Sequence, residues 1–298
     1  MLYLQFKAES RRILYQFHFL VITFFLALVG CQKSENQIIA QLTQEEKKDL
    51  DYFFRLLCFD HYGSFVLFGS KPLCEMCFFD TGRDPESFSP FDRNPAKGWQ
   101  VWEKIRSKVS CKQYLLIKRS VRNNGMPGSD KDYGSIFLMD IQKTALILAE
   151  NYEIFKACTD ENFHPLEVIF ELENPDSSFW NKVFSLDNHI AKGLLFGFGK
   201  RNSVIWSGNL KAQSHASQVS KYTKPCLLLP STKPIQIPSG LARNHMKFGK
   251  NIEELTIPFF WCIEEDEIKK QYEQEKQRIQ QIYRGKDVVE ITLQRIVK

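Results

Sequence analysis

The sequence predicts an α+β fold, with short antiparallel strand pairs packed against several helices in a single mature domain. Two patterns favour it. Apolar stretches of strand length occur in pairs around turn residues, and other apolar residues recur three or four positions apart, as on one face of a helix. The chain shows no internal repeat and no regular alternation of strands with helices, so a parallel α/β sheet is not expected. Its 298 residues, 25 of them phenylalanine, are enough for a large aromatic core.

The first predicted element is a secretory signal. Lys7, Arg11 and Arg12 form a cationic start, and an apolar run from Phe17 to Gly30 follows. A charged start, an apolar middle and small residues at the end are typical of a signal peptide. An uncleaved transmembrane helix is the alternative, but a membrane span needs about 20 mostly apolar residues and this run is shorter.

The end of this run, Leu28-Val29-Gly30-Cys31, resembles the lipobox of bacterial lipoproteins. The resemblance implies cleavage before Cys31, lipidation of its sulfur, and acylation of the new N-terminus with a chain such as palmitate. It therefore implies a membrane anchor in the bacterial cell envelope. Gln32, rather than Asp, follows the cysteine, and in this family that favours the outer membrane over the inner one. We expect a signal peptide over residues 1–30, the lipidated cysteine with a polar tether over 31–42, and an α+β domain over 43–298.

The body of the chain begins with a helix and a strand pair. Thr43 and Glu46 form a capping box, which predicts a helix start, and apolar residues at helical spacing follow. Two strands are then expected, Ser64–Phe68 and Leu73–Phe79, around the turn Gly69–Pro72.

A loop rich in Gly, Pro and Ser separates this pair from the next elements. It covers Asp80–Gly98, and a helix is expected over Trp99–Val109. A second strand pair, Gln113–Val121 and Gly134–Met139, then flanks the polar loop Arg122–Tyr133.

Helical patterns dominate the next part of the chain. One helix is expected over Ile141–Cys158, and Pro165 and Pro175 suit the first turns of two more. Asp187 is a candidate cap for a further helix over Asn188–Phe196.

The remaining expected elements are a strand over Ser203–Trp206, an irregular stretch over Ser207–Asn251, a strand over Leu255–Ile263 interrupted by Pro258, a charged helix over Asp266–Arg284, and a strand over Val288–Val297. The apolar stripe of the charged helix is narrow, which is typical of a surface helix that packs on a core.

The eight cysteines do not form a recognisable disulfide framework. With Cys31 lipidated seven remain, an odd number that cannot all pair internally, and we expect zero to two bridges. Cys74 and Cys77 have CxxC spacing, but no second pair completes a zinc site. Because a strand would place the two on opposite faces, core packing is the expected role, and redox chemistry or metal binding is the alternative.

No motif identifies a catalytic residue, a metal site or a cofactor. Gly193, Gly197, Gly199 and Lys200 approach the spacing of a phosphate-binding loop, but they follow a predicted helix instead of preceding one. A glycine cap at the end of that helix explains them better. Cys58 beside Asp60-His61 would suit a nucleophilic site, although the histidines are otherwise scattered.

Charge is distributed unevenly along the chain. No Asp or Glu occurs from Asn188 to Ile252, a stretch with ten Lys and Arg residues, whereas Thr144–Asp187 has nine acids and two lysines. Such asymmetry indicates a face that attracts anions. The alternative is that the acidic helices pack beside the basic stretch and neutralise it. The candidate anion-binding residues are Lys200, Arg201, Lys211, Lys221, Lys224, Arg243 and Lys247.

Three segments, Phe65–Pro72, His189–Ser203 and Tyr272–Leu293, resemble proteins of chlamydia-like intracellular bacteria, and this resemblance implies no activity. The sequence as a whole favours a lipid-anchored envelope protein that binds an anionic lipid, an acidic glycan or an acidic protein, and nucleic acid is not an expected partner. An exported hydrolase with an unidentified active site is the alternative.

Overall fold

The structure is a computed structural model, and it describes residues 35–79, 95–109, 111–121, 133–185, 188–208, 233–234, 251–258, 260–262 and 266–297. Contacts divide the chain into two units, Met1–Thr43 and Gln44–Lys298. In the first unit Glu35–Ala40 forms helix α2, so part of the expected tether is helical. The expected signal segment and Cys31 lie outside the described residues. Within the described part of the chain, no helix combines the length and the apolar composition that a membrane span requires.

Three antiparallel strands form the main sheet of the second unit, and the α+β class is confirmed. They are β1 (Leu73–Phe79), β2 (Tyr114–Val121) and β3 (Tyr133–Asp140), in the order β1-β3-β2. Leu73 of β1 and Leu115 of β2 both pair with Met139 of the central strand. All three strands were expected from the sequence, but they form one sheet where the sequence predicted separate pairs.

The expected strand over Ser64–Phe68 is wrong. Gly63–Phe68 is the short helix α4, and all of it except Phe68 is buried. The expected strand over Val288–Val297 is wrong as well, because Val288–Ile296 is helix α14, capped by the Asp287 carboxylate. A short apolar run fits a buried helix as well as a buried strand, so periodicity cannot separate the two.

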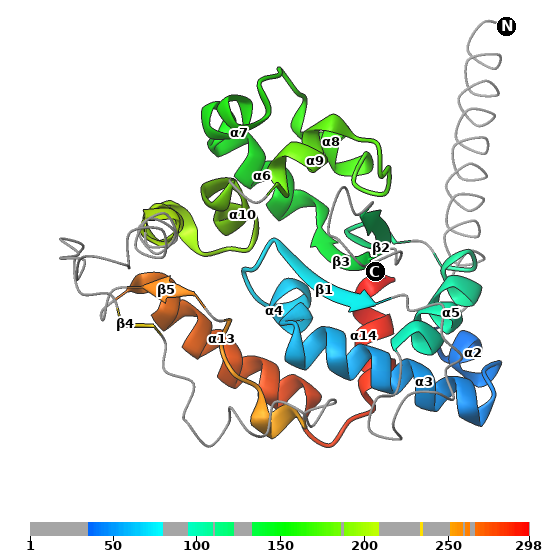
Figure 1. The fold of residues 1–298 in the computed structure, drawn as a ribbon. Coiled ribbons are helices and arrows are strands. Elements are labelled where there is room, and N and C mark those ends of the chain that lie inside the picture. Colours follow the sequence, from blue (N-terminus) through cyan, green and yellow to red (C-terminus); the bar gives the residue numbers. More distant parts are fainter. Residues whose placement is uncertain are drawn as a thin grey trace, which may run out of the picture. The chain divides into compact units, whose positions relative to one another are not determined.

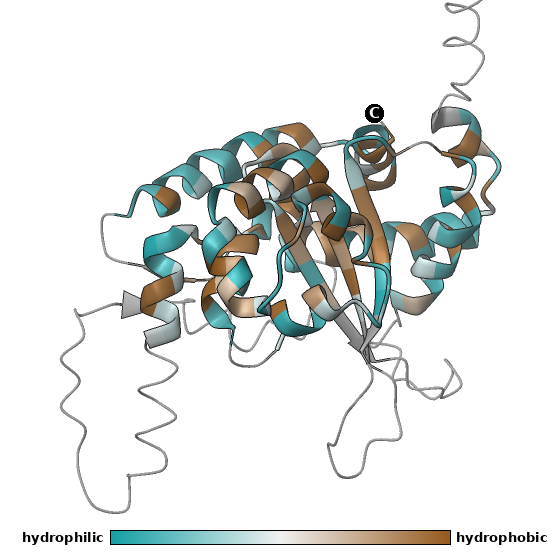
Figure 2. Ribbon diagram, turned by 90° about the horizontal axis from the view of Figure 1, so that it is seen from above, coloured by the Kyte–Doolittle hydropathy of each residue, from teal (hydrophilic) through white to brown (hydrophobic). Residues whose placement is uncertain are grey.

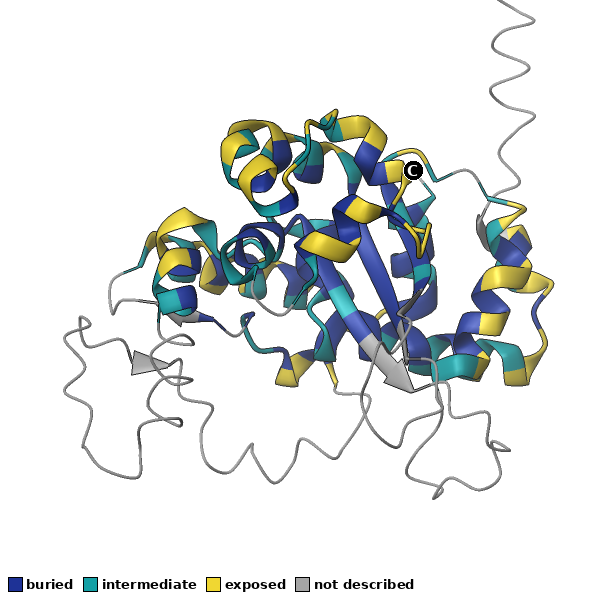
Figure 3. Cartoon of the chain, turned by 45° about the horizontal axis from the view of Figure 1, so that its top comes forward, coloured by how far each residue is buried: buried dark blue, intermediate teal, exposed yellow. Residues whose placement is uncertain are grey.

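Helices cover both faces of the sheet (Figure 1). On one face, Phe137 and Met139 of β3 pack into a core with Leu148 and Trp180. This group of helices comprises α6 (Ile141–Glu150), α7 (Tyr152–Thr159), α8 (Pro165–Phe170), α9 (Ser178–Val183) and α10 (His189–Leu195). Because both faces are covered, the strands lie among the most buried parts of the unit (Figure 3).

On the other face, Leu138 of β3 points at Gly63 of α4, where an added Cβ would lie 3.2 Å from the leucine side chain. This second group comprises α3 (Gln44–Arg55), the π-helix η1 (Leu56–Asp60), α4, α5 (Pro95–Arg106), α13 (Glu267–Tyr283) and α14. Hydrophobic residues of the helices face the sheet and hydrophilic ones face outward (Figure 2).

Several helix boundaries confirm the sequence signals. Pro165 occupies the first turn of α8, and Asp266 caps α13 by accepting a hydrogen bond of 3.1 Å from the Lys269 backbone N–H. The single helix expected over Ile141–Cys158 is instead two helices that meet at Asn151. Pro175 lies before α9, whose cap is Ser177.

The region after α10 differs most from the expectation. Residues 199–208 are helical, so the strand expected over Ser203–Trp206 is wrong. The strand expected over Leu255–Ile263 is reduced to β5 (Trp261–Cys262), which pairs with β4 (Lys233–Pro234), and the 3-10 helix η4 (Ile252–Glu254) precedes it. Pro258 explains part of this difference, because proline has no N–H for a strand ladder.

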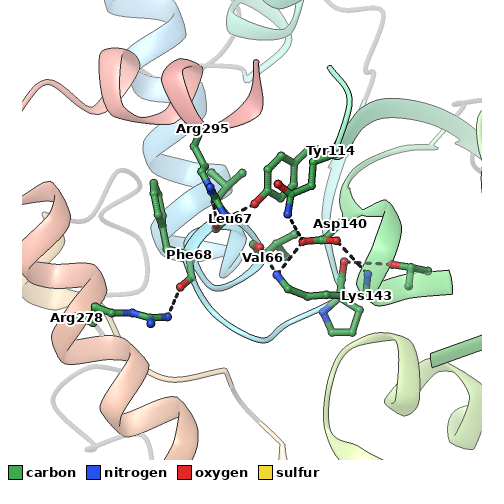
Figure 4. A network of polar contacts seen from close by, with 11 residues as sticks. Val66, Leu67, Phe68, Tyr114, Asp140, Lys143, Arg278 and Arg295 are labelled. Atoms are coloured by element: carbon green, nitrogen blue, oxygen red, sulfur yellow. Dashed lines mark hydrogen bonds and ion pairs between the residues drawn. The ribbon is translucent and has the colours of Figure 1, made fainter. Parts of the chain in front are cut away.

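Helix α4 is held at its C-terminal end by cations from three other helices (Figure 4). Its last carbonyl groups carry the negative end of the helix dipole, which favours positive side chains. The bonds join Lys143 of α6 to Val66 (3.0 Å), Arg295 of α14 to Leu67 (2.8 Å), and Arg278 of α13 to Phe68. The end of α4 and the turn that follows it are therefore fixed from several sides.

Candidate functional site

The turn between α4 and β1 places Lys71 at the edge of the sheet. The Lys71 backbone N–H donates to the Phe65 carbonyl at 3.2 Å. The carbonyl of the next residue, Pro72, accepts from the Asp140 backbone N–H at 2.9 Å and from the Thr144 hydroxyl at 3.3 Å. These bonds anchor the turn to both α4 and the end of β3.

The side chain of Lys71 is buried, with 3% of its surface exposed. Its ammonium donates to the Phe196 carbonyl and lies 5.4 Å and 5.3 Å from the centres of the Phe196 and Phe198 rings. A cation near an aromatic ring in this way gains electrostatic stabilisation from the π system. The lysine thus forms its contacts with residues about 125 positions further along the chain.

A Schellman motif at the end of α10 positions the two phenylalanines. The Phe198 N–H bonds to the Gly193 carbonyl at 2.9 Å and the Gly197 N–H to the Leu194 carbonyl at 3.0 Å, which are the two bonds of that motif. Gly197 has a φ of +78°, and the Tyr272 hydroxyl of α13 donates to its carbonyl at 2.9 Å. The glycine cap expected here is confirmed. It positions Phe196 and Phe198, whose rings lie next to the Lys71 ammonium.

Burial lowers the pKa of Lys71 from its ordinary 10.5 to about 8, and the nearby Cys74 opposes this only in part. None of the described acidic residues forms an ion pair with the ammonium. Phe196 also supplies the one hydrogen-bond acceptor that described residues give it. A buried cation with spare donors is costly unless another group binds it.

A partly open cavity of about 180 Å³ lies beside Lys71. One of its wall residues, Tyr62, has a φ of 64°, an uncommon left-handed conformation for a bulky side chain. Such backbone strain persists only where the surrounding structure enforces it, and it clusters at ligand-binding sites. The cavity is lined by His61, Tyr62, Lys71, Cys74, Glu75, Phe196, Phe198 and Pro258.

The other ionisable residues in the wall differ from Lys71. Burial raises the pKa of the Cys74 thiol to about 12, so the thiol is protonated at neutral pH and is a poor nucleophile. Glu75 of β1 accepts a hydrogen bond of 2.6 Å from the Ser135 hydroxyl of β3. Lys71 is the one lysine or arginine among the described residues that line the cavity.

A second cavity, of about 440 Å³, lies between α7, α10 and the helical residues 199–208. Burial raises the pKa of Cys158 in its wall to about 11. Its lining residues are Glu153, Ile154, Ala157, Cys158, Asn188, Ile190, Ala191 and Ser207.

Two of the predicted anion-binding residues are described. Lys200 and Arg201 are adjacent, exposed, and at the start of the helical residues 199–208. Neither forms an ion pair with a described residue. The other candidates, Lys211, Lys221, Lys224, Arg243 and Lys247, lie outside the described residues, as does the proposed lipidation site Cys31.

The described contacts of Cys58 do not form a nucleophilic site with His61. Cys58 is fully buried, and its sulfur lies 3.8 Å from the hydroxyl oxygens of Thr292 and Tyr283, while His61 lines the Lys71 cavity. Burial raises the pKa of Cys58 to about 12. Among the described residues, no group of three or more His, Cys, Asp and Glu side chains is arranged to hold a metal ion.

Sequence reasoning missed the Lys71 cavity. Gly69-Ser70-Lys71-Pro72 has the composition of an exposed turn. Nothing in that composition indicates that Phe196 and Phe198 cover the lysine.

Comparisons with protein-family models, with curated proteins and with solved structures give no match.

Proposed function

We propose that this chain is a lipid-anchored protein of the bacterial cell envelope whose Gln44–Lys298 unit binds an anionic partner and catalyses no reaction. The supporting observation is the acid-free basic stretch from Asn188 to Ile252. Where this stretch is described, Lys200 and Arg201 present two adjacent exposed charges without a described acidic partner. Exposed like charges of this kind attract polyanions in a salt-dependent way.

The lipobox-like end of the leader, with Cys31, supports the anchor. Two or more acyl chains hold a protein stably at a membrane, because each buried methylene contributes about 0.8 kcal/mol. A bacterial host that expresses the chain and is fed an alkyne analogue of palmitate should label the wild type, and Cys31→Ser should remove the label. An unlabelled wild-type chain would refute the anchor.

Binding through the basic stretch is tested by salt elution of the full-length chain in non-ionic detergent from heparin, used as a generic polyanion. The double variant Lys200→Glu/Arg201→Glu should elute at lower salt than the wild type, and Lys221→Glu/Lys224→Glu should do the same. The control Lys156→Glu/Lys286→Glu changes net charge equally at exposed lysines outside the stretch. Equal shifts for control and test variants would contradict a localised basic face.

An exported hydrolase is a second candidate, because the Lys71 cavity contains both His61 and the potential nucleophile Cys74. The raised pKa of Cys74 opposes this function, since the thiolate is the reactive form. Limited alkylation with iodoacetamide at neutral pH, followed by peptide mass spectrometry, separates the candidates. Preferential labelling of Cys74 over the half-buried Cys111 would favour the enzyme, and the reverse order favours the binding protein.

A further inference from the structure

Lys71 combines a buried charge with a cavity that can receive a ligand. The ammonium has three N–H donors, and the Phe196 carbonyl is the one acceptor among the described residues. The described carboxylates leave its charge without a partner, although 97% of the residue is removed from solvent. A buried cation of this kind is stabilised by an anion that enters the adjacent space.

The size and walls of the cavity restrict the ligand. A cavity of about 150 Å³ is large enough for benzene, so about 180 Å³ accommodates a molecule of similar size with one small polar group. Tyr62, Phe198 and Pro258 provide apolar and aromatic surface opposite the charged end. The negative charge of Glu75 in the same wall opposes a second anionic group on the ligand.

We propose that this cavity binds a small monocarboxylate with an apolar tail, whose carboxylate pairs with the Lys71 ammonium between Phe196 and Phe198. Phe196 and Phe198 belong to the acid-free stretch, but the charged group of this site is Lys71, which is not one of the basic side chains proposed to bind a polyanion. It assigns a role to the buried charge of Lys71, which has no described carboxylate partner.

Isothermal titration of the full-length chain in non-ionic detergent tests the site with benzoate as the probe. Benzamide has the same shape without the charge, and phthalate has a second carboxylate. A charge-assisted hydrogen bond predicts that benzoate binds about ten- to a hundredfold more tightly than benzamide. Phthalate should bind more weakly than benzoate, because of Glu75 and because of its size.

Lys71→Met retains an unbranched side chain but removes the charge, and it should lower the affinity for benzoate about tenfold or more. Binding of benzamide should change little in this variant. Lys156→Met, at an exposed lysine outside both the cavity and the basic stretch, is the control and should bind benzoate like the wild type. Equal affinity for benzoate and benzamide, or full retention of benzoate binding in Lys71→Met, would overturn the proposal.

A measurement on the wild type avoids dependence on the folding of the variant. Affinity for benzoate should fall as pH rises through about 8, where the free cavity loses the lysine proton, while affinity for benzamide should stay level. His61 also lines the cavity. An affinity for benzoate that is flat across about two pH units around 8 would also refute the site. The other titratable groups near Lys71 are Tyr62, Cys74 and Glu75 in the cavity wall and Tyr272, whose hydroxyl bonds to the Gly197 carbonyl.

Discussion

Replacing Lys71 by Met should change how the stability of the fold depends on pH. The pKa of Lys71 is about 8 in the folded chain and 10.5 in ordinary surroundings, because burial disfavours the ammonium. At pH values between these two pKa values, the unfolded chain binds more protons than the folded one. The free energy of unfolding therefore rises with pH across this window, and the cost of the buried charge is present in full below it.

The size of the effect follows from the two pKa values. At about 1.4 kcal/mol per pKa unit, the buried charge costs about 3 kcal/mol at pH 7. About 1 kcal/mol of this cost is recovered between about pH 7 and pH 9. Above pH 9 the buried thiols of Cys58 and Cys74 act in the opposite direction, because burial raises their pKa values to about 12. The comparison is therefore made below pH 9.

The assay is urea unfolding of the full-length chain, followed by the fluorescence of its buried tryptophans, at several pH values from about 7 to 9. The difference in unfolding free energy between wild type and Lys71→Met should move in favour of the wild type by about 1 kcal/mol over this range. Lys200→Met, which alters an exposed lysine, should follow the wild type. The absolute stability of Lys71→Met depends also on the lost contact with the Phe196 carbonyl, so the slope with pH is the quantity that decides.

Parallel pH profiles for the wild type and Lys71→Met would refute the reasoning. They would mean that Lys71 titrates like a lysine in water. Phe196 and Phe198 would then not exclude solvent from the ammonium. The proposal that a carboxylate ligand binds Lys71 would be refuted as well.

Three further changes test the packing. Gly285→Ala should cost roughly 1–2 kcal/mol of left-handed strain, because the space around Gly285 is open. Gly197→Ala should destabilise the chain by more, because the added Cβ at Gly197 would also lie 2.4 Å from the Tyr272 hydroxyl. Equal shifts of the two melting temperatures would contradict this. Arg119→Met should cost about 3 kcal/mol in urea unfolding, since the buried guanidinium bonds to oxygens of Leu172, Asn174, Pro175 and Asn181, and a loss below about 1 kcal/mol would be inconsistent with that. Phe155→Ala should cost about 3–5 kcal/mol and the exposed control Leu146→Ala less than about 0.5 kcal/mol, and similar unfolding midpoints for the two would count against the core assignment.

Local signals in the sequence predicted much of the fold. The helix-initiating Pro165 acts through neighbouring backbone groups, so its effect is readable over a few positions. The strands β2 and β3 were predictable for a similar reason, since both have strand length and flank a polar segment. The order of the strands was not predictable, because it depends on which helices cover each face.

The errors arose where tertiary surroundings decide the structure. The β-branched residues of Val288–Ile296 favour a strand, yet this segment is a helix because Val289, Leu293 and Ile296 are buried on one side of it. The break at Asn151 was hidden by apolar residues that continue at helical spacing through both helices.

The candidate site was less predictable than the fold. Lys71 belongs to a turn of ordinary composition, and its burial depends on Phe196 and Phe198, which a sequence pattern cannot place beside it. Of the predicted anion-binding residues, Lys200 and Arg201 are described and exposed, and their binding role stays a prediction. The glycine cap at Gly197 was predicted from the sequence. That it positions Phe196 and Phe198 in the wall of a cavity was not predicted.

The three side-chain hydrogen bonds to the end of α4 affect how the Gln44–Lys298 unit unfolds. Six residues are too few for a helix to persist alone in water, so α4 depends on tertiary contacts. Its terminal carbonyls bond to side chains 77, 210 and 228 positions away, and such distant contacts raise the contact order of the fold. The buried amides of α4 should therefore exchange hydrogen for deuterium only when the whole unit unfolds, whereas those of the more exposed α8 should exchange through local opening.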